Sequence, residues 1–559
     1  MKNYFRENAI FYFVALLIGI VLVNIIASNY FFRIDLTEEK RYTISDASKS
    51  VIKKLDDQIF IDVYLEGDFP PMYKRLQKAV KETINELKIY NNRNIQVRYT
   101  DPMSETDEAK RNRFLSQLVR KGIQPTQLVS NEKDAQTNKI VFPGAIVSYG
   151  SREIPIMFLK GNRGEGEEQM VNQSIENIEY ELITAIKEVS TMEKKKIAFL
   201  YGHGELDSLQ TLDIRKELSQ YYQVKQVDLG RVPNLDNFDA LVMAKPSLKF
   251  NDEDKLKIDQ FVVNGGKALF FIDAIHIKLD SLKENGSLAY PYELNLDDLF
   301  FKWGIRFNQD LVQDISCTRL PVNVGNVGNQ PKFVLMPWRF SPVIMNFAEN
   351  SSIVRNMDAL LCNFVGTLDT LKTKDLVKTP LAFTSKYTKV VGAPVEVSLD
   401  EMKEKPQPEE FKQKNKIISC LIEGKFSSSY AYRPLFKEQY PGIVQTKNDS
   451  KVLFFADGDF IANDYDPVKQ QIVPLGTNKY TKESHANKDF VVNTLNYMLD
   501  SNGLIHIRNK QISLRPLDKI KIEKDKKKWQ ILNVLVPLVL VLILGVLKFQ
   551  YRKKKYTRF

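Results

Sequence analysis

A short motif rich in glycine, histidine and glutamate follows one of the most apolar segments of the chain. Residues 194–200 (KKKIAFL) have the composition of a buried strand, and Gly202, His203, Gly204 and Glu205 come just after it. Glycines allow backbone amides to face a ligand, and His203 has the chemistry of a ligand contact or a general base. The alternative is a structural turn in which His203 bonds local backbone. We predict a ligand-binding loop at residues 202–205.

Two aspartates follow a second apolar, strand-like segment late in the chain. Residues 451–456 (KVLFFA) are followed by Asp457 and Asp459, which flank a glycine. Carboxylate oxygens are the ligands that hard cations prefer, so Asp457 and Asp459 are our candidate metal ligands. A polar turn after a strand is the alternative interpretation.

Patterns typical of several enzyme classes are missing from the sequence. It contains no G-x-x-x-x-G-K-[ST] phosphate loop, no G-x-S-x-G or G-x-C-x-G elbow and no H-E-x-x-H zinc motif. The three cysteines, Cys317, Cys362 and Cys420, have no C-x-x-C spacing, so they predict neither a disulfide framework nor a zinc site. We therefore predict no catalytic residue, no cofactor and no P-loop ATPase activity.

The elements that precede residue 190 predict a small α/β domain. Helical spacing or capping signals occur in residues 45–55, 72–90, 105–120 and 169–189, and strand composition in residues 58–65, 94–100, 139–141, 145–149 and 153–158. The order β-α-β-α-β-β-α is typical of a thioredoxin-like fold, which we assign to residues 29–190. The first strand is followed by EGDFPP, without a C-x-x-C motif. Because thiol exchange needs a thiolate, this domain is predicted to be a scaffold or a binding module.

Residues 191–505 predict a second domain with a parallel sheet. Strand patterns at 194–200, 224–229, 240–244, 267–273 and 451–456 alternate with helical patterns at 211–222, 252–264 and 489–499. Such alternation indicates a parallel sheet covered by helices, with a large insertion at about 275–450. Ligands of open α/β sheets bind beyond the carboxyl ends of the strands, where the 202–205 loop is expected to lie.

Two apolar segments, residues 9–28 and 529–548, predict a transmembrane helix near each end of the chain. Each is long enough to cross a hydrocarbon core of about 30 Å. A cleaved signal peptide is the alternative for the first, but its apolar run is long and no A-x-A-like site follows. The tails, residues 1–8 and 549–559, are basic, which predicts cytoplasmic termini and a body outside the cytoplasm.

The net charge of +11 lies in the membrane flanks rather than in the body. The N-terminal tail nets +1, residues 519–528 of the basic stalk (506–528) net +4 and the C-terminal tail from Lys548 nets +6, which together account for the whole excess. We therefore expect contacts between these flanks and membrane lipids and no nucleic-acid partner.

The order of these motifs resembles the GldG family of gliding-motility-associated ABC transporter auxiliary proteins. The resemblance includes an N-terminal anchor followed by RYTIS at residues 41–45, YGHGE at 201–205, FADGDF at 455–460 and a basic-flanked C-terminal span. It implies an ABC permease and a separate ATPase subunit as partners. It also implies a second domain of glutamine-amidotransferase-like or flavodoxin-like fold, related to a domain of an intraflagellar-transport protein.

Together these features predict an α/β protein of the bacterial inner membrane that spans it twice and has a periplasmic body. Its expected role is that of a non-enzymatic accessory subunit of an ABC transporter in gliding motility or protein secretion, as a scaffold or a ligand-capturing module. Two alternatives stay open. One is a membrane-tethered hydrolase or amidase that uses His203, and the other is a true solute-binding protein.

Overall fold

The protein divides into two compact units, residues 1–510 and residues 511–559. The computed structural model describes residues 11–22, 24, 43–132, 135–159, 167–191, 193–279, 282, 286–328, 330–440, 442–466, 469–500, 503–509 and 519–556. The predictions for residues 1–8 and for the RY of the RYTIS motif lie outside these residues. Residues 25–42 and 557–559 also lie outside the described part of the chain.

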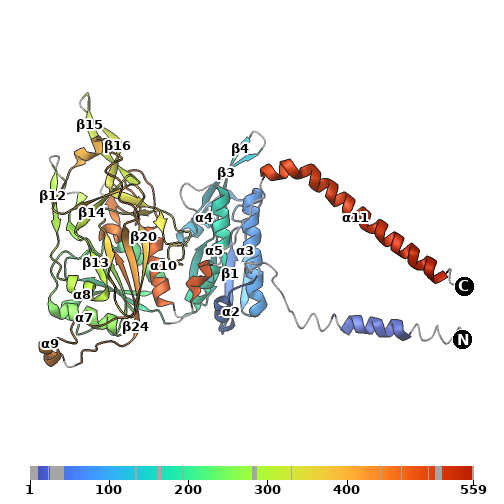
Figure 1. Ribbon diagram of the computed structural model, residues 1–559, viewed down its shortest axis with the longest axis horizontal. Coiled ribbons are helices and arrows are strands. Elements are labelled where there is room, and N and C mark those ends of the chain that lie inside the picture. Colours follow the sequence, from blue (N-terminus) through green and yellow to red (C-terminus); the bar gives the residue numbers. More distant parts are fainter. Residues whose placement is uncertain are drawn as a thin grey trace. The chain divides into compact units, whose positions relative to one another are not determined.

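Residues 43–190 form a four-stranded mixed sheet with helices packed against it (Figure 1). The strand order is β2 (Ile95–Tyr99), β1 (Ile59–Val63), β5 (Gly144–Tyr149), β6 (Arg152–Met157). β1 and β2 are parallel, whereas β5 is antiparallel to both β1 and β6. The helices are α2 (Asp46–Lys53), α3 (Pro71–Tyr90), α4 (Glu108–Arg120) and α5 (Glu167–Ser190). The elements expected from the sequence are therefore present.

The core of this domain forms where the buried faces of its strands and helices pack together. In β1 alternate residues are buried, so Ile59 and Ile61 face inward. In α3 the residues Leu76, Val80 and Ile84 recur every four positions and are almost fully buried. Their spacing places them on one helical face, which packs with β1 into a single hydrophobic cluster.

One strand of this region pairs differently from our expectation. The strand predicted at residues 139–141 is the end of β4 (Ala135–Val141), which forms a hairpin with β3 (Thr126–Glu132) outside the four-stranded sheet. The sequence analysis missed β3. Its TQLVSNE sequence is mainly polar, so apolar alternation gave no signal for a strand.

An eight-stranded sheet dominates the rest of the first unit. Its order is β17 (Asn346–Phe347), β20 (Leu376–Phe383), β23 (Ile417–Lys425), β24 (Asp449–Phe455), β10 (Lys267–Phe271), β9 (Ala240–Ala244), β7 (Lys196–Tyr201), β8 (Gln223–Asp228). The last five strands are mutually parallel. In chain order they run 2-1-3-4-5, so the direction of winding reverses between β7 and β9. The associated helices are α6 (Leu212–Tyr221), α7 (Asp252–Val263) and α10 (Asn487–Leu499).

The predicted insertion, about 275–450, both extends this sheet and builds a separate cluster. β17, β20 and β23 add to the parallel part as an antiparallel edge. The remaining elements are β11 (Ile275–His276), β12 (Ser287–Pro291), α8 (Asp297–Trp303), β13 (Ile305–Phe307), β14 (Asp310–Asp314), β15 (Cys317–Val327), β16 (Gln330–Ile344), β18 (Leu360–Leu361), β19 (Leu368–Thr370), β21 (Thr388–Gly392), β22 (Val395–Val397) and α9 (Pro434–Gln439). β25 (Asp464–Asp466) and β26 (Gln471–Val473) follow β24.

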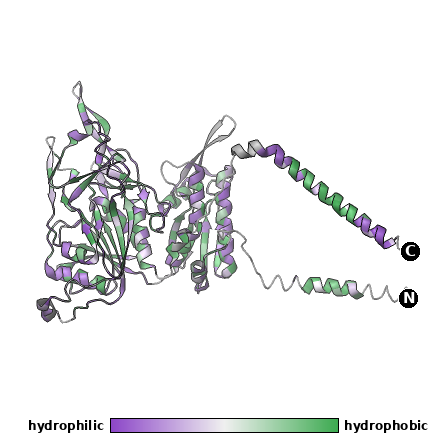
Figure 2. Cartoon of the chain, viewed as in Figure 1, coloured by the Kyte–Doolittle hydropathy of each residue, from purple (hydrophilic) through white to green (hydrophobic). Residues whose placement is uncertain are grey.

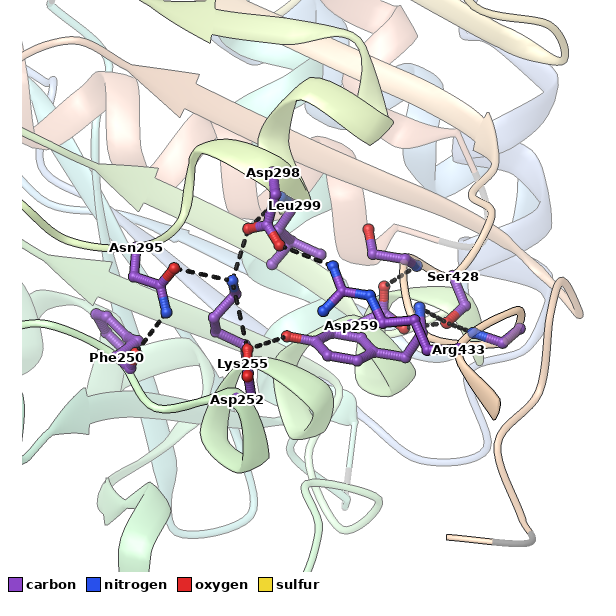
Figure 3. Close-up of polar contacts among 12 residues, drawn as sticks. Phe250, Asp252, Lys255, Asp259, Asn295, Asp298, Leu299, Ser428 and Arg433 are labelled. Carbon is purple, nitrogen blue, oxygen red and sulfur yellow. Dashed lines mark hydrogen bonds and ion pairs between the residues drawn. The ribbon is translucent and has the colours of Figure 1, made fainter. Parts of the chain in front are cut away.

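A buried polar cluster ties α7 to the insertion (Figure 3). The Lys255 ammonium of α7 is almost fully buried and donates to Asp298 of α8 at 2.6 Å, and Arg433 contacts the same carboxylate at 3.1 Å. Ser428 donates to the buried Asp259 of α7 at 2.6 Å. Because buried charges are tolerated when they are paired, this cluster fixes α7 against α8 and against the loop after β23.

The last described residues of the first unit pack into the first domain. The 3-10 helix at Leu504–Asn509 places Leu504, Ile505 and Ile507 in the hydrophobic core formed by residues 44–189. Our boundary at residue 505 therefore passes through residues that share one core. The first domain is completed by residues more than 300 positions away, which no local pattern indicates.

The second unit is the helix α11 (Lys519–Tyr556), with Pro537 in its interior. Its Asp525–Tyr556 portion is long and apolar enough to cross a membrane, which includes the span predicted at 529–548. Figure 2 shows its hydrophobic middle between hydrophilic ends. Within the described residues the N-terminal apolar helix covers only Phe11–Leu22, which is shorter than a span requires. By length and composition, one candidate membrane helix is found in the described part of the chain.

Candidate functional site

The carboxyl ends of four parallel strands bring the two predicted motifs together. The loop with Gly202–Glu205 follows β7, and Asp457 and Asp459 follow β24. Between them lie the ends of β9 and β10, followed by Lys245 and Asp273. Motifs more than 250 residues apart in sequence thus share one sheet edge, beside the point where the winding direction reverses.

Lys245 is the electrostatic centre of this edge. Its side chain is almost completely buried, and its ammonium lies 3.1 Å from Asp273 Oδ2 and 2.5 Å from Asp459 Oδ2. Burial alone would lower the pKa of the Lys245 ammonium, but the two carboxylates outweigh burial and raise it well above its usual value. Lys245 is therefore a permanent cation that holds the loops after β9, β10 and β24 together.

Two of the carboxyl groups around Lys245 have raised pKa values. Burial raises the pKa of Asp273 to about 6, although Lys245 and the Gly458 amide oppose the shift. Burial, with the nearby Asp273 and Asp459 charges, raises the pKa of Asp457 well above its usual range. Three carboxylates thus lie near a single cation in a water-poor environment, which makes this edge sensitive to loss of that cation.

Two backbone features show how tightly these loops approach one another. Lys245 has a left-handed backbone with φ of 54°, a conformation that costs a non-glycine residue energy. A Cβ atom at Gly458 would lie 2.7 Å from Lys245 Cγ and 3.0 Å from its Cα. The glycine between the two aspartates is therefore required by close packing on Lys245, which explains the D-G-D pattern.

Asp457 and Asp459 have different environments despite their proximity in sequence. Asp457 is fully buried, and its oxygens accept the backbone amides of Asn363 (2.7 Å) and Phe460 (2.9 Å). Asp459 forms the ion pair with Lys245. Among the described residues, no group of three or more histidine, cysteine, aspartate or glutamate side chains is arranged to hold a metal. The metal interpretation of Asp457 and Asp459 stays a prediction.

His203 is packed against α7. Its ring stacks on Phe250 at 3.8 Å between centroids, and its Nε2 lies 3.3 Å from Asp254 Oδ2 in the first turn of that helix. Its backbone oxygen accepts the amides of Ser247 and Leu248, both at 2.9 Å. The loop after β7 is therefore joined to the loop after β9 through both the backbone and the ring of His203.

Glu205 folds back on its own loop. Its Oε2 accepts the His203 amide at 2.6 Å, and its Oε1 is buried without a hydrogen-bond partner, 3.9 Å from His203 Nδ1. Burial raises the pKa of the Glu205 carboxyl. A buried acceptor that lacks a donor is an unusual feature, and a ligand group or a water can supply the missing hydrogen bond.

Gly204 is the position in this loop that most clearly requires glycine. Its φ is 71°, and a Cβ atom there would lie 2.2 Å from Ser247 Oγ. Ser247 Oγ donates to the Gly204 carbonyl at 2.9 Å. Gly202 also has a positive φ, 118°, near Asp228. Both glycines thus adopt positive φ values that other residues rarely adopt.

A cavity of about 340 Å³ lies at this sheet edge. Gly204, Glu205, Lys245 and Asp459 line it, whereas Gly202, His203 and Asp457 do not. The insertion contributes further lining residues, among them Lys278, Tyr292, Thr318, Leu320, Asn363 and Phe364, and Pro474 and residues 476–480 also line the cavity. Its wall is therefore a mixture of charges, hydroxyls, amides and apolar side chains from segments that are distant in sequence.

The sequence analysis missed Lys245 and Asp273, although a signal for both exists. Each comes shortly after an apolar strand, in ALVMAK and ALFFID, as the predicted site residues do after β7 and β24. The rule that strand ends carry the site, applied to all four strands, would have found them. The lining residues from the insertion have no comparable signal.

Comparison with known proteins places this domain in a family. The model of a family described as an ABC-type uncharacterized transport system, the ABC transporter auxiliary family, matches residues 194–494, more than half of the chain. The chain belongs to this family. Membership implies association with an ABC transporter complex and an accessory role within it. The matched segment contains the cavity-lining residues described above.

Two further findings concern the whole chain and its first domain. A protein of Borreliella burgdorferi described as uncharacterized is 22% identical, over 99% of this chain and all of its own length. Residues 38–148 match a domain of unknown function, DUF7088.

Among solved structures, the N-terminal domain of mmIFT52 is 13% identical, and 55% of this chain and 98% of that chain are covered. With a TM-score of 0.31, this likeness does not establish the fold.

Proposed function

We propose that this protein is a membrane-anchored, non-enzymatic accessory subunit of an ABC transporter whose body captures a ligand. The ligand binds in the cavity at the carboxyl ends of β7, β9, β10 and β24. The partners are a permease subunit and a separate ATPase subunit, since the sequence has no phosphate-loop motif of its own.

The observation that carries the proposal is the position and composition of the cavity. It lies where the winding direction of a 2-1-3-4-5 parallel sheet reverses, the place where open α/β sheets bind ligands. Glu205 offers an unsatisfied buried acceptor beside it, and Lys245 keeps the surrounding loops in place. The cavity is lined by charged, hydroxyl and amide side chains together with apolar ones, so it can hold a polar ligand through several convergent hydrogen bonds and charges.

The geometry favours binding over catalysis. Among the described residues that line the cavity there is no histidine and no cysteine. His203, the base of the hydrolase alternative, is stacked on Phe250 and directed to Asp254. Burial raises the pKa of Cys317 to about 11 and of Cys420 to about 12, which disfavours a reactive thiolate in either.

The finer assignments belong to the same proposal. The first domain is a thioredoxin-like module without redox cysteines, supported by the strand order β2-β1-β5-β6. The second is flavodoxin-like or glutamine-amidotransferase-like, supported by its 2-1-3-4-5 parallel strands. Two spans, a periplasmic body and a role in gliding motility or protein secretion complete the proposal.

Co-purification tests the accessory role. The full chain, tagged and isolated from its native membrane in mild detergent, should bring with it a multi-span subunit and an ATPase in fixed ratio. Isolation of the chain alone, after cross-linking in intact cells, would contradict the proposal.

A cavity-filling substitution tests ligand capture separately. Ala462 lines the cavity and is half-buried, so Ala462→Phe should occupy part of the ligand volume. We expect complex assembly to be retained and rescue of a deletion strain to be lost. Leu209→Phe, at an exposed position outside the cavity, is the matched control and should rescue. Full rescue by Ala462→Phe would exclude the cavity as the working site.

A further inference from the structure

The β15–β16 hairpin is packed at its base and exposed toward its tip. At the base Trp338 and Phe340 are almost fully buried, and Leu320 and Val322 are 8% exposed. Farther out along β16, Phe333 is 60% exposed and Leu335 is 44% exposed. Val324 on β15 is 41% exposed. Figure 1 shows the hairpin extending beyond the rest of the body.

Strand register places Phe333 and Leu335 on the face of the hairpin opposite Val322. Val322 pairs with Val334, so the opposite face carries the next pairs, Asn323 with Phe333 and Pro321 with Leu335. At the tip glycines, Gly325 and Gly328, no described atom lies within 4 Å of the position that a Cβ would occupy. The outer face of the hairpin is therefore open within the described part of the chain.

The charge of the hairpin has one sign. Between Cys317 and Ile344 the sequence contains no aspartate or glutamate, whereas it contains Arg319, Lys332 and Arg339. Lys332 directly precedes Phe333 and is exposed. An exposed aromatic and aliphatic group with an adjacent cation and no carboxylate is complementary to an anionic, partly apolar surface.

We propose that the tip of the β15–β16 hairpin docks on a bilayer that contains anionic phospholipid. Val324, Phe333 and Leu335 enter the headgroup region, and Lys332 meets lipid phosphates. The helix α11 favours lipid as the partner of this hairpin. A chain whose helix crosses a membrane keeps its body beside a bilayer. The shape of the hairpin agrees, since a narrow ribbon exposed on both faces can enter a fluid interface end-on but offers a protein little flat area. The proposal does not depend on the ligand cavity.

An environment-sensitive dye on the full chain tests this proposal. A cysteine is introduced by Val324→Cys in a Cys317→Ser background, where Cys362 and Cys420 are fully buried and should not react. The labelled full chain is reconstituted in vesicles of phosphatidylcholine with or without phosphatidylglycerol. Tyr387→Cys, 64% exposed and outside the hairpin, is the matched control position.

The expected result is a blue-shifted emission at position 324, quenched by lipid-borne quenchers, that is stronger with phosphatidylglycerol and weaker in high salt. Phe333→Ala should lower the docked fraction about fivefold to tenfold, since it removes a large apolar side chain from the interface. The control dye should report water throughout.

Three outcomes would overturn the proposal. One is an emission at position 324 that is the same in vesicles and in detergent. Another is a shift in detergent that grows with protein concentration, which would assign the tip to a second copy of the chain. The third is a shift seen only in native membranes that hold the other transporter subunits, which would assign it to a protein partner.

Discussion

Replacement of Lys245 by methionine should destabilise the α/β domain more than any other single loss of charge at the sheet edge. Lys245 and methionine have similar length and flexibility, so the apolar stem is kept and the ammonium is lost. The variant leaves Asp273 and Asp459, formerly 3.1 and 2.5 Å from the ammonium, without a counter-charge. Asp457 lies fully buried beside them.

The magnitude follows from the burial of this group. Removing one partner of a buried ion pair costs about 3–5 kcal/mol, because the remaining charge keeps its desolvation penalty. Lys245 and Asp273 are only 8% and 3% exposed at their side chains, so screening by water gives little relief. For a domain of this size the loss corresponds to a fall in melting temperature on the order of 10 °C.

The loss should depend on pH with a definite sign. The folded pKa of Asp273, about 6, lies above the ordinary value, so the folded state binds this proton more tightly than the unfolded state. Stability from this group is therefore lost as pH rises through about 4 to 6. Lys245 lowers the pKa of Asp273, so its removal raises that pKa further. The deficit of Lys245→Met should be large above neutral pH and should shrink in acid.

Thermal melting of the full chain in detergent measures both effects. Lys245→Met is compared with wild type at about pH 7.5 and pH 5. Lys302→Met, at an exposed position of α8, is the matched control and should change little. Addition of Asp459→Asn to Lys245→Met should restore part of the loss. A shift equal to the control at pH 7.5, or an equal deficit at both pH values, would refute the electrostatic reasoning.

Three further predictions concern the loop, the domain boundary and the topology. Gly204→Val should lower assembly and yield more than His203→Ala, because a branched side chain opposes the φ of 71° and overlaps Ser247; the reverse order, with assembly intact, would favour catalysis. Ile505→Ala should destabilise the first domain by about 2–5 kcal/mol, seen as faster amide exchange in its core, because Ile505 is buried there. Cysteines introduced at residues 553–556 should react only with reagents that reach the cytoplasm, and labelling from outside would contradict the proposed orientation.

Local patterns in the sequence predicted most elements of the first domain and the parallel strands and their helices in the second, but not the individual elements of the insertion at about 275–450. Strand composition located β1, β2, β5 and β6 within a few residues, and helical spacing located α3 and α5. The parallel sheet and its five strands were also expected from the alternation of strand and helix patterns. These predictions succeed because burial of one face of a helix or strand makes apolar residues recur with the period of that element.

The candidate site was predicted in part. The 202–205 loop and the aspartates after β24 do lie at one sheet edge, but only Gly204, Glu205 and Asp459 of these line the cavity. Lys245 and Asp273, which join the motifs, were missed because the strand-end rule was applied to β7 and β24 and not to β9 and β10. The pattern that suggested a metal site at the two aspartates did not reveal that Asp459 pairs with a lysine that follows another strand.

By itself, the sequence determined the strands and helices with a clear apolar period, the position of the apolar C-terminal helix and which ATPase and protease motifs are missing. The tertiary structure alone decided which strands became neighbours. That choice put Lys245 between Asp273 and Asp459, added β20 and β23 to the sheet as an antiparallel edge and placed Ile505 in the core of the first domain. The physical reason is that periodicity records which side of an element is buried, whereas the partner on that side is selected by packing and charge pairing across hundreds of residues.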